Sequence, residues 1–129
     1  MFEHFQLRHI PALFAATTTT FGGLWPLFDP RGSLHEFGFT SRIADSPAAA
    51  PVMIIGCART SILGILMFYY YSRGQLEVVD TILGVFGAYA GLIDSYVVWK
   101  EGNLRKAIFR FVSSGLLSAW AFSGQTAGR

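Results

Sequence analysis

Three ionisable side chains, Arg59, Asp94 and Arg110, lie inside long apolar stretches of the sequence. In surroundings of low dielectric, a guanidinium group stabilises negative charge that develops on a carbonyl oxygen, and a carboxylate can orient that group or exchange a proton. Arginine also presents a rigid fork of N–H donors that binds carboxylates and enolates through two hydrogen bonds. We therefore take Arg59, Asp94 and Arg110 as the candidate catalytic residues.

Small residues accompany these charges at helical spacing. At 100° per residue, Gly87 and Gly91 fall on the same stripe of a helix as Asp94, and their spacing is the glycine-x-x-x-glycine pattern that lets two membrane helices approach closely. Helix packing is the alternative explanation for these glycines. As candidate substrate-binding residues we take Gly56, Gly87, Gly91, Ser113 and Ser114.

Four apolar stretches must position these residues. They cover residues 10–28, 52–71, 78–99 and 107–122, and each approaches the roughly 20 residues that an α-helix needs to cross the hydrocarbon of a bilayer. Tryptophan and tyrosine, which prefer the membrane boundary, lie near the ends of the stretches. These aromatic residues are Trp25, Tyr69, Tyr70, Tyr71, Trp99 and Trp120. We predict an all-α fold with a single domain over residues 1–129, a four-transmembrane-helix bundle with a long first loop at 29–50.

The composition agrees with a lipid environment. Of the 129 residues, 52% are hydrophobic and 14% are charged, whereas a soluble domain has roughly 25% charged residues. A net charge of +2 is too small to predict a nucleic-acid surface, so nucleic acid is not an expected partner. The single cysteine, Cys57, excludes a disulfide within the chain.

The three charges fall at similar depths if the stretches are helical. Counting about 1.5 Å per residue from the side of the first and third loops, Asp94 and Arg110 lie roughly 8 to 9 Å deep and Arg59 roughly 13 Å. A charge at the bilayer centre costs at least about 2.5 to 3.5 kcal/mol on insertion scales. We therefore expect the three side chains to converge in a dry interior pocket. The alternative is that the arginines only bridge helices while their long side chains reach the interface.

Loop charges predict an orientation. The first and third loops carry more positive residues than the termini and the second loop, so these two loops are expected to be cytosolic and the termini luminal. The membrane we expect is that of the endoplasmic reticulum. The first group is Arg31, Arg42, Lys100, Arg105 and Lys106, and the second is Arg8, Arg73 and Arg129.

The sequence lacks the motifs of metal sites, cofactor sites and nucleophilic catalysis. The histidines His4, His9 and His35 lack the i, i+3 or i, i+4 spacing of helical metal ligands. There is also no dinucleotide fingerprint, phosphate loop or nucleophile elbow. We therefore expect no metal and no cofactor.

Several motifs resemble a family of small fungal integral-membrane proteins described as a domain of unknown function, DUF4267. The resemblance covers about residues 22–120. It implies four membrane helices and, because some members are encoded among fungal biosynthetic genes for polyketides and terpenoids, a lipophilic substrate. The motifs are FDPRG at 28–32, EFGF at 36–39, GCARTSILGIL at 56–66 and GLIDSYVVWKEGNLRKA at 91–107.

The charged layer beside an apolar bundle favours an enzyme. We expect a membrane-embedded, cofactor-independent tailoring enzyme, a cyclase or isomerase that can include pericyclic closure, acting on a hydrophobic polyketide or terpenoid intermediate. One alternative is a non-catalytic membrane protein that carries lipophilic metabolites or anchors partner enzymes, with glycine seams that could also form a homo-oligomer. Another is a soluble helical protein that buries its apolar helices in an oligomer.

Overall fold

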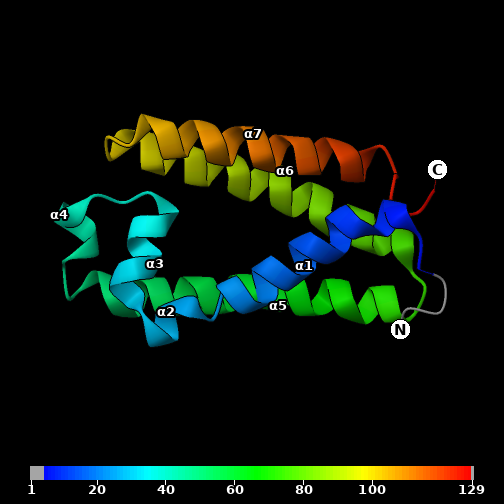
Figure 1. Cartoon of the computed structure of the whole chain (residues 1–129), viewed down its shortest axis with the longest axis horizontal. Coiled ribbons are helices and arrows are strands. Elements are labelled where there is room, and N and C mark those ends of the chain that lie inside the picture. Colours follow the sequence, from blue (N-terminus) through cyan, green and yellow to red (C-terminus); the bar gives the residue numbers. More distant parts are fainter. Residues whose placement is uncertain (1–4, 129) are drawn as a thin grey trace.

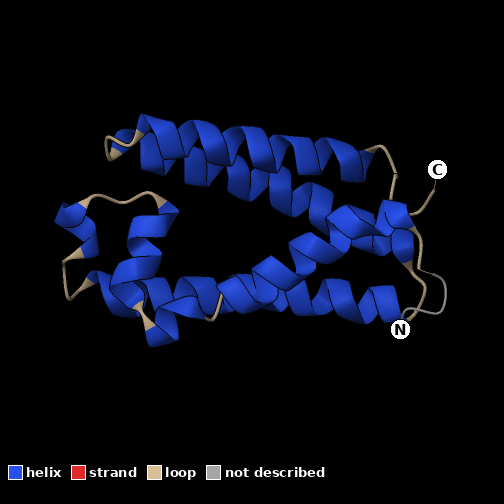
Figure 2. Cartoon of the chain, viewed as in Figure 1, coloured by secondary structure: helices blue, strands red, loops and turns tan. Residues whose placement is uncertain are grey.

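The computed structural model describes residues 5–128, and this part of the chain folds into seven α-helices and one 3₁₀ turn without a β-strand (Figure 2). The prediction of an all-α fold is confirmed. The elements are η1 (Leu7–His9), α1 (Ile10–Gly22), α2 (Trp25–Phe28), α3 (Pro30–Phe37), α4 (Ser41–Ala44), α5 (Ala49–Ser72), α6 (Leu76–Lys100) and α7 (Leu104–Phe122).

The long helices form two pairs. α6 packs along α7, and α1 packs on α5. The pairs meet where a short turn joins α5 to α6, and they diverge away from that turn (Figure 1). The short helices α3 and α4 lie between the diverging ends, and we call residues 30–44 the cover. The four long helices and the cover therefore meet at the open end of the bundle, away from the turn between α5 and α6 (Figure 1).

Two helices, α5 with 24 residues and α6 with 25, are long and apolar enough to cross a membrane. At about 1.5 Å per residue each exceeds the roughly 30 Å of a hydrocarbon core. Only 17% of the most apolar window of α5 and 33% of that of α6 is buried inside the chain. Both helices therefore leave most of their apolar side chains at least partly exposed.

The predicted first span, 10–28, is divided in the structure. α1 has 13 residues, about 20 Å, and α2 follows as a separate turn. Pro26 explains the break, because it has no N–H to donate to the carbonyl one turn earlier. α7 has 19 residues but carries Arg105, Lys106 and Arg110. Four full-length spans are thus not confirmed, and two helices meet the length and hydropathy that a span requires.

The predicted long loop contains a capped helix. The Asp29 carboxylate accepts a hydrogen bond from the backbone N–H of Gly32 at 3.0 Å, and Pro30 occupies the first position of α3. Gly38 ends the helix with φ at 125°, a conformation that favours glycine. α3 has only eight residues, of which Ser33 and Leu34 are buried, so its amphipathic pattern is too short to identify a helix without the caps.

Candidate functional site

An ion pair between neighbouring helices lies beside the cover. Arg110 of α7 places its Nη1 3.9 Å from the Oδ2 of Asp94 on α6, and their side chains are 27% and 35% exposed. The two residues lie close because α6 and α7 are antiparallel neighbours joined by a three-residue connection at 101–103. The structure thus brings together two of the three charges that the sequence singled out.

Phe37 of the cover fixes the guanidinium group. The Arg110 Nε donates a hydrogen bond to the Phe37 carbonyl oxygen at 2.7 Å, and the guanidinium carbon lies 3.7 Å from the centroid of the Phe37 ring. This combines a charge-assisted hydrogen bond with a cation–π contact. The ring also stacks on Phe39, at 5.0 Å between centroids. The orientation of Arg110 therefore depends on the position of α3.

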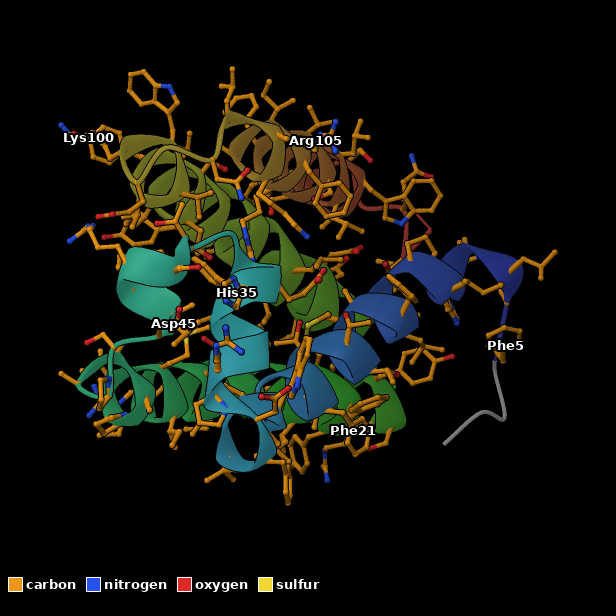
Figure 3. The ribbon with its side chains drawn as sticks, turned by 60° about the vertical axis from the view of Figure 1, so that its left-hand side comes forward. Phe5, Phe21, His35, Asp45, Lys100 and Arg105 are labelled. Carbon is orange, nitrogen blue, oxygen red and sulfur yellow. The ribbon has the colours of Figure 1, made fainter. Side chains whose placement is uncertain are left out.

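Further ion pairs hold the cover against α6 and α7. Lys106 lies 3.1 Å from the Glu36 carboxylate, and Arg42 pairs with Glu101. His35 of the cover and Asp45, which follows it in the chain, lie near one another (Figure 3), with the His35 Nε2 4.0 Å from the Asp45 Oδ1. Apolar packing accompanies these ion pairs, since Gly38 of the cover lies directly against the buried side chain of Val98.

Two cavities adjoin the ion pair. A cavity of about 630 Å³ lies between the cover, α5 and α6, and one of about 290 Å³ lies where α1, α2, α3, α5, α6 and α7 meet. Arg110 lines the smaller cavity. Both cavities are lined by Phe37, Met53, Cys57, Thr60 and Asp94. The polar pair thus lies at the junction of two largely apolar spaces, an arrangement typical of small-molecule sites.

Arg59, the third predicted catalytic residue, lies apart from this pair. Its side chain is exposed, and it makes no ion pair within residues 5–128. Cys57 and Thr60 line both cavities, whereas Arg59 lines neither of them. The expected cluster of three charges is therefore a pair in the structure.

The predicted substrate-binding residues occupy different places. Gly56 lines the larger cavity. Gly87 and Gly91 pack α6 against α7, because a Cβ at Gly91 would lie 2.5 Å from the Ser114 Cβ and one at Gly87 would lie 3.0 Å from the Ser114 carbonyl oxygen. The Ser113 hydroxyl donates within its own helix, to the Phe109 carbonyl at 2.7 Å. Three of the five predicted residues therefore form a helix interface.

Comparison with known families supports the motif resemblance. The family model described as "Domain of unknown function (DUF4267)" matches residues 16–124, which include both cavities and the ion pair. The chain belongs to the DUF4267 family. No curated protein and no solved structure gives a match to this sequence.

Sequence reasoning missed several residues of this DUF4267 site. Phe37 lies within the EFGF motif, but its contact with Arg110 through both its carbonyl and its ring depends on where α3 lies. Met53, Cys57 and Thr60 were absent from the candidates although GCARTSILGIL contains two of them. Only their spacing in the sequence could have indicated that these residues lie together, since residues three or four positions apart share one face of a helix.

A second polar cluster of the DUF4267 protein lies at the opposite end of the bundle. The buried His9 Nδ1 accepts a hydrogen bond from the Gln6 backbone N–H at 3.2 Å and lies 2.8 Å from the Tyr71 hydroxyl. Because a backbone N–H only donates, the contact with Gln6 favours the neutral tautomer that carries its proton on Nε2. The buried Asp80 carboxylate accepts from the backbone N–H of Ala127 at 2.9 Å. The cluster thus connects the first and last described segments to α5 and α6.

His9 makes this end of the bundle sensitive to pH. Burial lowers the pKa of His9, the neighbouring Arg8 lowers it further, and Asp80 offsets part of the shift. The folded state therefore prefers the neutral ring. The associated stability is fully present above the unfolded pKa of about 6.5 and declines as the pH falls from there toward the folded pKa.

Proposed function

We propose that this DUF4267 protein is a membrane-embedded enzyme that isomerises or cyclises an apolar small molecule without a cofactor. The observation that carries the proposal is the Asp94–Arg110 pair at the junction of two largely apolar cavities. An acidic and a cationic side chain with separate roles form the minimal equipment for moving a proton next to a carbonyl group. A polyketide or terpenoid intermediate is the substrate class that we favour.

The outward apolar surface supports a membrane location. Large side chains are more than half exposed on every long helix, including Phe14 (63%), Ile55 (55%), Leu92 (60%) and Leu116 (68%). Contiguous apolar surface of this kind is a contact area for protein or lipid. We propose that α5 and α6 span the bilayer and that α1 and α7 accompany them. The cationic cover end would face the cytosol, and the endoplasmic reticulum is the compartment that we favour.

The proposed reaction conserves electrons and needs no co-reactant. Arg110 donates a hydrogen bond to the carbonyl oxygen of the substrate, and the Asp94 carboxylate removes a proton from the neighbouring carbon. The electron pair of the broken C–H bond forms an enolate, whose oxyanion the guanidinium stabilises. Asp94 then returns the proton to another carbon. In the cyclising variant, the enolate carbon instead adds to the β-carbon of an unsaturated carbonyl group in the same molecule, the π electron pair of that group moves toward its carbonyl oxygen, and Asp94 returns the proton to the new enolate. Apolar walls that fold the substrate contribute by positioning the reacting atoms.

Membranes that contain the protein test this proposal. The substrate is a long-chain β,γ-unsaturated ketone, because its isomerisation brings the double bond into conjugation and is followed by ultraviolet absorbance. Asp94→Asn and Arg110→Gln should each lower turnover by at least about 100-fold, the usual size of a lost acid-base or oxyanion contribution. Arg105→Gln is the matched control, because Arg105 is an exposed arginine on the same helix that lines neither cavity. Equal turnover in all four proteins would refute the assignment.

A non-catalytic carrier of lipophilic molecules is the second candidate. It is favoured by the ion pair itself, which connects α6 to α7 and could serve assembly alone. Exchanging the charges with Asp94→Arg and Arg110→Asp should then preserve ligand binding, whereas the enzyme would lose turnover. A homo-oligomer or a scaffold for partner enzymes would need a surface other than the seam of Gly87 and Gly91, since these glycines contact α7 of their own chain.

A further inference from the structure

We propose that the Asp94–Arg110 pair selects a ligand by one uncharged oxygen that accepts and donates at the same time, a hydroxyl or an enol. The inference rests on the proposed binding of an apolar small molecule, but it does not depend on turnover. It concerns the chemical class of the ligand and the way in which the ligand is oriented.

The spacing of the pair is the first argument. Charge-assisted N–H···O bonds are about 2.7 to 2.9 Å long, and the Arg110 Nη1 lies 3.9 Å from the Asp94 Oδ2. An oxygen about 2.8 Å from each atom would subtend roughly 90° between them, an angle that suits one lone pair and one O–H of the same oxygen. The pair is thus spaced for an oxygen bridge.

The unused hydrogen-bonding capacity of the two side chains is the second argument. Within residues 5–128, the Asp94 carboxylate accepts no hydrogen bond, and Arg110 donates only through Nε to the Phe37 carbonyl. The N–H groups on Nη1 and Nη2 remain free to donate, and the carboxylate remains free to accept. A hydroxyl satisfies one group on each side, whereas an ether leaves the carboxylate without a donor.

Charge balance is the third argument. Asp94 and Arg110 neutralise each other, and Lys106 is already paired with Glu36 at 3.1 Å. At the rim of the larger cavity, Arg42 is paired with Glu101. A ligand carboxylate would therefore meet the Asp94 carboxylate without a spare cation, and this repulsion is strong where water is scarce. The site should discriminate against carboxylic acids.

The position of Asp94 also indicates where the oxygen lies in the ligand. Asp94 lines both the cavity of about 630 Å³ and the cavity of about 290 Å³. A ligand whose oxygen is attached within its carbon chain can extend one apolar arm into each space. A secondary alcohol or an internal enol therefore fits better than a chain that ends in a hydroxyl group.

Cys57 provides the measurement, because it is the single cysteine of the sequence and lines both cavities. The full chain is reconstituted in vesicles, and the rate of Cys57 modification by a small membrane-permeant thiol reagent is followed by mass spectrometry. The three probes are dodecan-6-ol, its methyl ether, and the branched carboxylic acid with the same two alkyl arms. Dodecan-6-ol should protect Cys57 at a concentration about tenfold or more below that of the ether, since a hydrogen bond to a charged group is lost in the ether.

Two variants separate this proposal from general partitioning of the probes into the bilayer. Asp94→Asn removes the repelling charge, so the carboxylic acid should now protect Cys57, whereas in the natural sequence it should not. In the paired variant Cys57→Ser with Ile62→Cys, the thiol lies on the outer face of α5, where Ile62 is 53% exposed. No probe should change its labelling rate.

The outcomes are decisive in both directions. Equal protection by alcohol and ether, stronger protection by the acid, or no protection by any probe overturns the proposed selectivity. Protection by the alcohol without turnover of any substrate supports the oxygen-binding site and argues against the proposed reaction. Turnover without preference for the alcohol supports the reaction and overturns this inference.

Discussion

Gly64 controls how closely α1 approaches α5, and Gly64→Ala should destabilise the protein. A Cβ at this position would lie 2.2 Å from the Thr20 Oγ1, 2.7 Å from the Thr20 backbone nitrogen and 2.8 Å from the Ala16 carbonyl oxygen. Rotation of the Thr20 hydroxyl can relieve the first contact. The two backbone contacts can reach an ordinary distance of 3.4 Å only if α1 moves by about 0.6 to 0.7 Å. Overpacking of this kind costs about 1 to 3 kcal/mol.

The matched control is Gly56→Ala, in the same helix. No atom lies within 4 Å of a Cβ at Gly56, so this variant should show only the gain of about 1 kcal/mol that alanine has over glycine inside a helix. The difference in free energy of unfolding between the two variants therefore isolates the clash. It is measured by denaturant or thermal unfolding of the protein in lipid discs.

The same substitution has a consequence at the candidate site. The backbone of Gly23, at the end of α1, lies so close to α5 that an added Cβ would be 2.6 Å from the Cys57 carbonyl oxygen. Displacement of α1 by Gly64→Ala should therefore widen the smaller cavity and raise the rate of Cys57 modification. If Gly64→Ala is as stable as Gly56→Ala and Cys57 reacts at an unchanged rate, the proposed close approach of α1 and α5 is refuted.

Three further predictions concern other parts of the molecule. Arg59→Leu removes an exposed charge from the middle of α5, so the protein should be more stable in a bilayer by up to about 2.5 to 3.5 kcal/mol; a loss of stability on unfolding in lipid discs would instead reveal a partner for Arg59. As the pH falls from about 6.5 to 5, the free energy of unfolding should decrease by at most about 1.4 kcal/mol per pH unit. His9→Gln should flatten this dependence, and thermal unfolding with the same slope in both proteins would contradict the role of His9. Gly91→Ala should destabilise the α6–α7 pair, because the added Cβ would lie 2.5 Å from the Ser114 Cβ. The double variant Gly91→Ala with Ser114→Gly should regain part of the lost stability, and a double-mutant cycle of unfolding free energies measures this coupling.

The ion pair was predictable because it depends on simple geometry. Two helices joined by a short turn are antiparallel neighbours, and counting residues from that turn places Asp94 and Arg110 at the same level. The glycine spacing further indicated which stripe of α6 is close to another helix, and the structure places α7 there. Neither inference required knowledge of any residue distant in sequence.

The orientation of α5 was not predictable in this way. This helix is apolar on all sides, so its sequence does not specify which face packs inward. Gly56, a predicted substrate-binding residue, lines the larger cavity, whereas the residues that approach α1 are Ser61, whose hydroxyl donates to the Thr20 carbonyl at 2.7 Å, and Gly64. This orientation of α5 leaves Arg59 exposed and places Cys57 at both cavities.

Because of the cover, the orientation of the Arg110 guanidinium group and the shape of the two cavities depend on each other. Phe37 lines both cavities, and the same residue accepts the hydrogen bond of Arg110 and stacks beneath its guanidinium group. A ligand that displaces the Phe37 ring would therefore also change the direction in which Arg110 donates. The pair of Lys106 with Glu36 is half-exposed and adds little stability, so Phe37 is the main link between α3 and α7. The shape of both cavities and the orientation of Arg110, the proposed catalytic cation, thus depend on the same helix, α3.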